Sequence, residues 1–179
     1  MRKSQQEFLG KGFEKKSAKF GGSLLKGNAR DKRPLSTKQP LHLVLRASKS
    51  MLRKPGIYHQ VNDVIYETAK KYGFRIYRYA NVGNHLHVLL RISNRRLWGH
   101  FIREITGRIA TRAQGLKGPQ AGREKFWQYK PFTRIVDGWR KAYRTMCEYI
   151  ELNQLEGEGL IKRSEIATLK EYRALFMDG

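Results

Sequence analysis

Apolar residues recur along this chain with two different spacings from residue 40 onward. An apolar residue at every second position is typical of a strand that buries one face, and recurrence at every third or fourth position is typical of a helix that packs one side against a core. In chain order, these spacings predict a strand beginning at residue 40, a helix over residues 56–72, strands over residues 74–80 and 85–90, a helix over residues 97–112, a strand over residues 126–136, a helix over residues 138–155 and a short helix over residues 164–176.

Glycine and proline positions sharpen these boundaries. Gly73 stands where the C-terminal cap of the first helix is expected. Residues 81–84 contain a glycine and make a tight turn, so the strands on either side should form a hairpin. Pro131 places the last strand at a sheet edge or a bulge, because proline donates no backbone hydrogen bond. The order β-α-β-β-α-β followed by helices predicts an α+β protein of the ferredoxin-like split βαβ class, with a four-stranded antiparallel sheet.

Charge indicates the kind of partner. The 179 residues carry 37 Lys and Arg against 15 Asp and Glu, a net charge of +22, yet 40% of them are hydrophobic. The chain should therefore fold and bind polyanions. Residues 1–38 hold eleven Lys and Arg, three acidic residues and few periodic apolar positions. They are predicted to form a flexible basic arm that either follows a phosphate backbone or only solubilises the protein, ahead of one folded domain over residues 39–179.

Cysteine content and hydropathy exclude several classes of protein. Cys147 is the only cysteine, so an intrachain disulfide and a cysteine-based zinc site are both excluded. Any metal must use histidine, carboxyl, amide or water ligands. No apolar run approaches membrane-spanning length, and the basic N-terminus lacks the apolar stretch of a signal peptide. We expect a cytoplasmic protein that does not bind membranes.

Two imidazoles stand two positions apart in an otherwise apolar strand. Strand side chains alternate between faces, so His85 and His87 point the same way while Leu86 and Val88 point the other way. This spacing provides a pair of metal ligands on one face. The alternative interpretation is an ordinary apolar strand with two histidines on its solvated face.

A phenol and an amide are placed together on the helix predicted over residues 138–155. At about 100° per residue, Tyr149 and Asn153 lie roughly 40° apart on one flank of the apolar stripe. Residues four positions apart are neighbours on a helix, so the two side chains should project together from the edge of the core. Each residue alone is typical of an ordinary boundary position.

Several blocks of sequence carry a family resemblance when taken together. They are Asn81-Val-Gly-Asn-His-Leu-His-Val-Leu-Leu90, residues 97–110, Phe126-Trp127, Arg134-Ile-Val136 and Tyr149-Ile-Glu-Leu-Asn153, with Gly21-Gly-Ser, Arg33-Pro-Leu and Leu41-His-Leu-Val-Leu-Arg46 before them. In this order the chain resembles the REP-associated tyrosine transposases, which belong to the wider single-tyrosine, His-hydrophobic-His superfamily of single-strand DNA nucleases. The resemblance covers nearly the whole chain.

The resemblance implies a reaction and a set of site residues. Tyr149, on a C-terminal catalytic helix, would be the nucleophile, and a divalent metal, Mg²⁺ or Mn²⁺, would be bound by His85, His87 and Asn153. Many relatives have Asn-Pro where this chain has Asn153-Gln154, so Gln154 remains an alternative amide ligand. The implied enzyme is a DNA endonuclease and strand transferase that acts on single-stranded or hairpin DNA through a 5′-phosphotyrosine intermediate.

Basic residues outside this set are candidates for DNA contacts. The arginines of the helix over residues 97–112 lie largely off its apolar stripe, with only Glu104 as an acidic neighbour. His42 should share a sheet face with the histidine pair, where a role in supporting the metal site, a DNA contact and a structural role all remain open. The candidate DNA-binding residues are His42, Arg46, Arg96, Arg103, Arg108, Arg112 and Arg134.

Two other functions share this order of elements. RNA-recognition domains also run β-α-β-β-α-β, so a non-catalytic nucleic-acid-binding module is the main rival. Those domains carry base-stacking aromatic residues on the third strand, where this chain has His85 and His87. A fold that keeps DNA binding and has lost cleavage is the other alternative. A monomer and a homodimer, with the site built within one chain or across two, are both compatible with the sequence.

Overall fold

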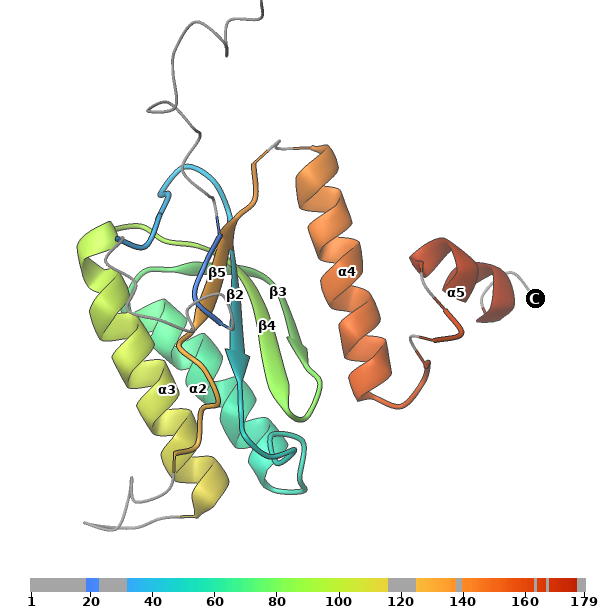
Figure 1. Ribbon diagram of the computed structural model, residues 1–179, viewed down its shortest axis with the longest axis horizontal. Coiled ribbons are helices and arrows are strands. Elements are labelled where there is room, and N and C mark those ends of the chain that lie inside the picture. The colour runs from blue at the N-terminus through green and yellow to red at the C-terminus, as the bar shows by residue number, and fades with distance from the viewer. Residues whose placement is uncertain are drawn as a thin grey trace, which may run out of the picture.

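Five antiparallel strands form one sheet, in the order β1-β5-β2-β4-β3, within the part of the chain that the computed structural model describes (Figure 1). That part comprises residues 19–22, 32–115, 125–137, 140–162, 164–166 and 168–176. Its elements are β1 (Lys19–Phe20), β2 (Leu41–Arg46), α2 (Ile57–Lys71), β3 (Arg75–Asn81), β4 (His85–Arg91), the 3-10 helix η3 (Arg95–Leu97), α3 (Trp98–Gln114), β5 (Phe132–Ile135), α4 (Lys141–Gly157) and α5 (Leu169–Phe176). No helix among these residues is both long and apolar enough to span a membrane.

The predicted α+β class is confirmed, and β2 to β5 are the four predicted strands. The fifth strand, β1, is two residues long and pairs with β5 at the sheet edge. It lies in the segment predicted as a flexible arm, most of which falls outside the described residues. The last strand is shorter than predicted, because β5 begins only after Pro131 and the residues before it make a single bridge, between Ala47 and Trp127.

The two faces of the sheet bury different side chains. Helices α2 and α3 cover one face, where the apolar alternation of β2 and β4 builds the larger core. Helix α4 covers the other face over a smaller apolar cluster that contains Ala80, Leu89, Val136 and Ile150. Because β2 and β4 are adjacent and antiparallel, their polar positions meet on this second face, beneath α4.

The C-terminal end of α4 is anchored to the turn between β3 and β4. The Asn81 side chain is fully buried there: its amide nitrogen donates to the Leu52 carbonyl at 2.8 Å, and its oxygen accepts from the Gly83 backbone at 3.0 Å. The Asn81 backbone N–H donates to Gln154 Oε1 on α4, also at 3.0 Å. A Cβ on Gly157 would lie only 2.5 Å from the Asn81 carbonyl oxygen, so the helix approaches the turn closely. These contacts fix where along the sheet α4 places its other side chains.

Candidate active site

Three imidazoles and one phenol meet between the sheet and α4. His87 on β4 and His42 on β2 are almost completely buried, and His85 is partly exposed. The Tyr149 ring from α4 stands edge-on to both buried imidazoles, with its centroid 5.4 Å from that of His87 and 6.1 Å from that of His42. Tyr149 remains 39% exposed. One chain therefore brings together the predicted nucleophile and the predicted histidine ligands.

Hydrogen bonds orient the imidazoles. His85 Nδ1 lies 2.5 Å from Asn84 Oδ1, and because an amide oxygen only accepts, Nδ1 carries the proton and Nε2 carries the lone pair. His42 Nε2 and His87 Nδ1 lie 3.0 Å apart, so one of these nitrogens donates to the other. The remaining nitrogen of His87, Nε2, is buried and has no hydrogen-bond partner among the residues that the structure describes. A buried imidazole nitrogen without a partner is unusual and indicates a place for a ligand.

The surroundings keep these histidines neutral. Burial, with a contribution from the Arg134 charge, lowers the pKa of His42 to about 4. Burial also lowers the pKa of His87, with smaller contributions from His42 and His85, and burial together with Arg46 lowers the pKa of His85. At neutral pH each ring is therefore uncharged and keeps one unprotonated nitrogen, and the neutral ring is the form of histidine that binds metals.

The donor set fits a metal site only if it includes an amide. Within the described ranges, no three His, Cys, Asp or Glu side chains are arranged to hold a metal ion. His42 directs its nitrogen at His87 rather than at a common centre, so only His85 and His87 are available as imidazole ligands. The unpartnered Nε2 of His87 and the lone pair on His85 Nε2 suit a divalent cation that takes its further ligands from an amide and from the phosphate or water.

The two candidate amides on α4 have different surroundings. Asn153 is 6% exposed, and its nitrogen donates to the Tyr149 carbonyl at 2.6 Å, which turns Oδ1 away from that carbonyl. Gln154 is bonded to the hairpin instead, because its oxygen accepts from the Asn81 backbone and its nitrogen donates to Glu158 at 2.5 Å. Among the described residues, the oxygen of Asn153 accepts no hydrogen bond, whereas the oxygen of Gln154 accepts one from the backbone of Asn81.

A family model described as Transposase IS200 like matches residues 36–153, a span that contains His42, His85, His87, Tyr149 and Asn153 and ends one residue before Gln154. This chain belongs to that family. The family expected from the sequence is thereby confirmed. The function of this transposase lies in DNA transposition, and it belongs to the DNA-cleaving enzymes.

The sequence and structure of this transposase were compared with solved structures, and the first match below resembles it in fold. One, a REP-associated tyrosine transposase bound to a REP hairpin, has 18% sequence identity and a TM-score of 0.57, over 72% of this chain and 74% of that chain. Another, a transposase-like protein from Deinococcus radiodurans R1, has 18% identity and a TM-score of 0.44, over 70% of this chain and 98% of that chain. No curated protein matches the sequence significantly.

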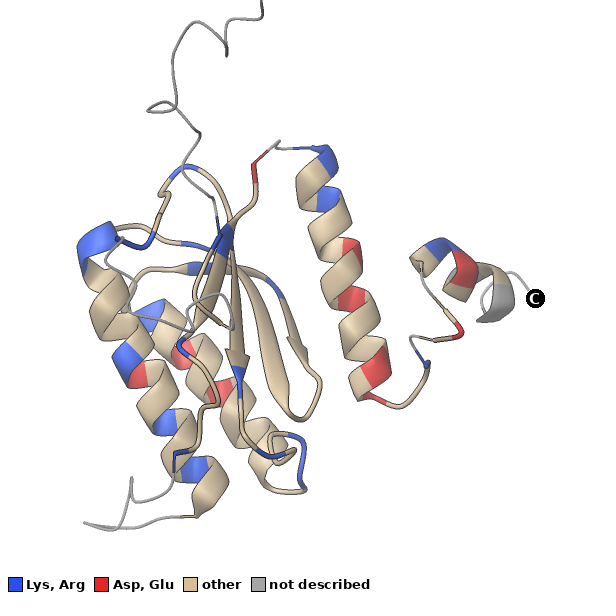
Figure 2. Ribbon diagram, viewed as in Figure 1, with Lys and Arg blue, Asp and Glu red and all other residues tan. Residues whose placement is uncertain are grey.

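The seven predicted DNA-binding residues of the transposase separate into two groups. The first group, His42, Arg46 and Arg134, lies on the face with the imidazoles. In the strand register, Arg46 is opposite His85 and Arg134 is opposite His42. The other four lie on η3 and α3, which belong to the layer on the opposite face, as the basic positions along α3 in Figure 2 indicate. These four are Arg96, Arg103, Arg108 and Arg112.

Two members of the second group already have partners within the transposase. Arg108 pairs with Glu67 at 2.6 Å and with Glu104 at 3.8 Å, so its charge joins α3 to α2. Arg112 donates to Gln60 on α2 at 3.4 Å. The structure thus places Arg108 in an ion-pair network, whereas Arg96 and Arg103 are exposed.

Some residues of the site were not predicted from the sequence. A cavity of about 310 Å³ contains the three histidines and Tyr149 together with Arg46, and Tyr129, Lys130 and Phe132 form another part of its lining. Phe132 lies opposite Val44 in the β2–β5 pairing, on the same face as Arg134. Strand alternation counted from Arg134 within the predicted strand was the signal that could have found it.

Proposed function

We propose that this transposase is a metal-dependent endonuclease and strand transferase for single-stranded, hairpin-containing DNA, with Tyr149 as the nucleophile. The observation that carries the proposal is the placement of the Tyr149 ring over His87, whose Nε2 is buried and unpartnered. A nucleophile beside two imidazole nitrogens that can each donate a lone pair to a metal suits phosphodiester cleavage better than nucleic-acid binding alone.

His85, His87 and Asn153 are the residues that would hold the metal. When bound, Mg²⁺ or Mn²⁺ would polarise the scissile phosphate and offset its negative charge, which otherwise repels an oxygen nucleophile. Mn²⁺ should serve as well as Mg²⁺, because two imidazoles are softer ligands than Mg²⁺ usually prefers.

His42 fits the role of a positioning residue for His87. Binding through His87 Nε2 requires the proton of that ring to be on Nδ1, and the 3.0 Å contact offers His42 Nε2 as its acceptor. The ring of His42 is neutral at pH 7, so its Nε2 can accept. Asn84 does the equivalent for His85 by accepting from Nδ1.

The bond changes of the proposed cleavage balance with proton exchange through water. The Tyr149 hydroxyl gives up its proton to water and its oxygen attacks phosphorus, the bond from phosphorus to the 3′-oxygen breaks, and that oxygen takes up a proton from water to leave a 3′-hydroxyl. Arg46 and Lys130 line the same cavity and can pair with the phosphates on either side. Because the phosphotyrosine keeps the phosphate activated, the 3′-hydroxyl of a second strand can displace Tyr149 and join two DNA ends without ATP.

An adduct assay with end-labelled DNA tests the proposal. Hairpin-bearing single-stranded oligonucleotides are incubated with the full chain and Mn²⁺, then resolved on a denaturing gel. A label on the 3′ end should shift to the size of a protein–DNA adduct, and a label on the 5′ end should be released in a short, free fragment. The absence of an adduct across a set of hairpins that bind the protein would contradict the proposal in favour of a binding module.

A further inference from the structure

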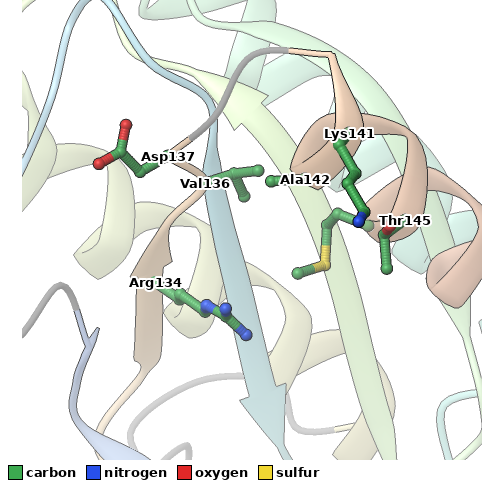
Figure 3. Close-up of a pocket in the computed structure, with 7 residues that line it drawn as sticks. Arg134, Val136, Asp137, Lys141, Ala142 and Thr145 are labelled. Carbon is green, nitrogen blue, oxygen red and sulfur yellow. The ribbon is translucent and has the colours of Figure 1, made fainter.

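A second cavity lies in the groove between the sheet and α4, next to the candidate active site. Its volume is about 470 Å³. The end of β5 and the residues that follow it form one wall, through Arg134 and Val136, and the first turns of α4 form the other, through Lys141, Thr145 and Met146 (Figure 3). Neither Lys141 nor Thr145 belongs to the site described above.

The two cations of this cavity are not neutralised by the protein. Arg134 and Lys141 are both exposed, and in the described portion of the chain neither makes an ion pair or a hydrogen bond to a side chain. One carboxylate, that of Asp137, also borders the cavity. It accepts a hydrogen bond from Gln39 at 2.7 Å, and Figure 3 shows it pointing away from Lys141 and Thr145. The cavity therefore presents a net positive charge, which suits an anion.

The rest of the lining suits a nucleotide. Val136, Ala142 and Met146 belong to the apolar cluster beneath α4 and form an apolar floor, on which a sugar or the edge of a base can rest. Thr145 supplies a hydroxyl that can donate to a phosphate oxygen. Lys141 is the first residue of α4, a 17-residue helix, so the positive end of the helix dipole adds to its charge.

The position of the cavity relates it to the scissile phosphate. Arg134 lies opposite His42 in the β2–β5 pairing, so both side chains are on one face of the sheet. Lys141 precedes Tyr149 by eight residues on α4, which is roughly 12 Å along the helix axis. At the ~3.4 Å rise of a stacked strand, this distance corresponds to about three or four nucleotides.

We propose that this cavity binds one backbone phosphate of the DNA strand, three or four nucleotides from the cleaved bond, between Arg134 and Lys141. The assignment of the strand to this groove rests on the proposed function. Holding the strand at this second point fixes its direction across the imidazoles, so that only one bond can reach the Tyr149 oxygen.

Binding measurements without metal test the site independently of cleavage. The affinity of the full chain for a fluorescein-labelled dT20 strand is measured in EDTA over a range of salt concentrations, for the wild type, Arg134→Gln, Lys141→Gln and the double variant. Each single variant should weaken binding about five- to tenfold and lower the slope of log affinity against log salt by about 0.7, the contribution of one phosphate of a single strand. The double variant should lower the slope by no more than either single variant, because both cations grip the same phosphate.

Lys70→Gln on α2 is the matched control, since it removes an exposed positive charge from the opposite layer. It should leave the slope unchanged. A loss equal to that of Lys141→Gln would mean that only the overall charge matters, and additive slopes in the double variant would mean two separate phosphates; either result overturns the proposal. Unchanged thermal unfolding midpoints show that the variants are folded.

A hairpin oligonucleotide with single methylphosphonate substitutions locates the phosphate. One position, three or four nucleotides from the cleaved bond, should weaken wild-type binding and have no effect in the double variant. If this coupling appears and no adduct ever forms, the phosphate site stands and the proposed cleavage fails. If adducts form and no position couples to Arg134 and Lys141, the phosphate site alone is refuted.

Discussion

Replacement of His42 by phenylalanine tests whether a buried neighbour prepares His87 to bind metal. Phenylalanine keeps a flat aromatic ring, slightly larger than the imidazole, at a position that is 5% exposed, and it removes the acceptor that lies 3.0 Å from His87 Nδ1. An unpaired N–H left at His87 costs about 1–3 kcal/mol of stability. His87 can reduce this cost only by adopting another tautomer or orientation, and either change takes Nε2 away from metal binding. Affinity for Mn²⁺ should fall about 10- to 100-fold.

His42→Gln is the matched rescue. A glutamine side chain places an amide oxygen close to the position of the imidazole Nε2, so it can accept the same hydrogen bond from His87. Mn²⁺ affinity, followed by electron paramagnetic resonance of the free ion, should return to within a few-fold of the wild type. Long-range proton–nitrogen NMR without metal should show the proton of His87 on Nδ1 in the wild type and in His42→Gln, and a mixture of tautomers in His42→Phe.

A His42→Phe variant that folds normally and binds Mn²⁺ as tightly as the wild type would contradict a role of His42 in orienting His87. An equal loss of affinity in His42→Phe and His42→Gln would contradict it as well, because the effect would then come from packing rather than from the hydrogen bond. Thermal unfolding of the metal-free proteins separates these cases from simple loss of the fold.

Three further predictions use simpler measurements. Tyr149→Phe should keep DNA binding, change stability by about 1 kcal/mol at most and form no adduct, whereas Tyr143→Phe, whose ring packs on the apolar cluster, should still form one on the same gel. EDTA should abolish the adduct and excess Mn²⁺ should restore it; adduct formation in chelator would refute metal dependence. Gly157→Ala should lower the free energy of unfolding by about 1–3 kcal/mol, because its Cβ would meet the Asn81 carbonyl at 2.5 Å. Gly107→Ala on α3, with nothing near its Cβ, should raise it by roughly 0.5–1 kcal/mol, and a stabilising Gly157→Ala in denaturant melts would contradict the docking of α4.

The main strands could be predicted because polar and apolar residues alternate along much of β2 and at the start of β4, although the structure buries most positions on both faces. Leu41, Leu43 and Leu45 are buried in the larger core as expected, and the histidines of β4 lie on the other face. Strand β1 could not be predicted, since two residues contain no period and its pairing with β5 joins segments more than a hundred residues apart. The spacing of apolar residues indicates which face of a long element is buried, but it does not identify a short edge strand.

The arginines of α3 show a second limit of sequence patterns. Their positions off the apolar stripe were compatible with DNA contacts, but the partner of Arg108 is Glu67 on another helix. Only the packing of α2 against α3 brings these two charges together. A pattern on one helix therefore predicts which side is exposed and cannot predict which charges are already paired.

The candidate active site depends on two alignments between distant segments: the register of β2 against β4, and the position of α4 along the sheet. No local sequence pattern encodes either of them. The contact of His42 with His87 requires β2 and β4 to align so that Val44, not His42, lies directly opposite His87, which leaves the two imidazoles as diagonal neighbours. The position of Tyr149 requires α4 to be held at its far end, where Gln154 and Gly157 meet the β3–β4 turn. The same turn leads directly into the strand with His85 and His87, so one structural element places the proposed nucleophile and its predicted metal ligands relative to each other. A shift of α4 by one helical turn, about 5.4 Å, would move Tyr149 away from His87. We therefore expect variants at this turn, such as Gly157→Ala, to lose adduct formation on the denaturing gel together with part of their free energy of unfolding.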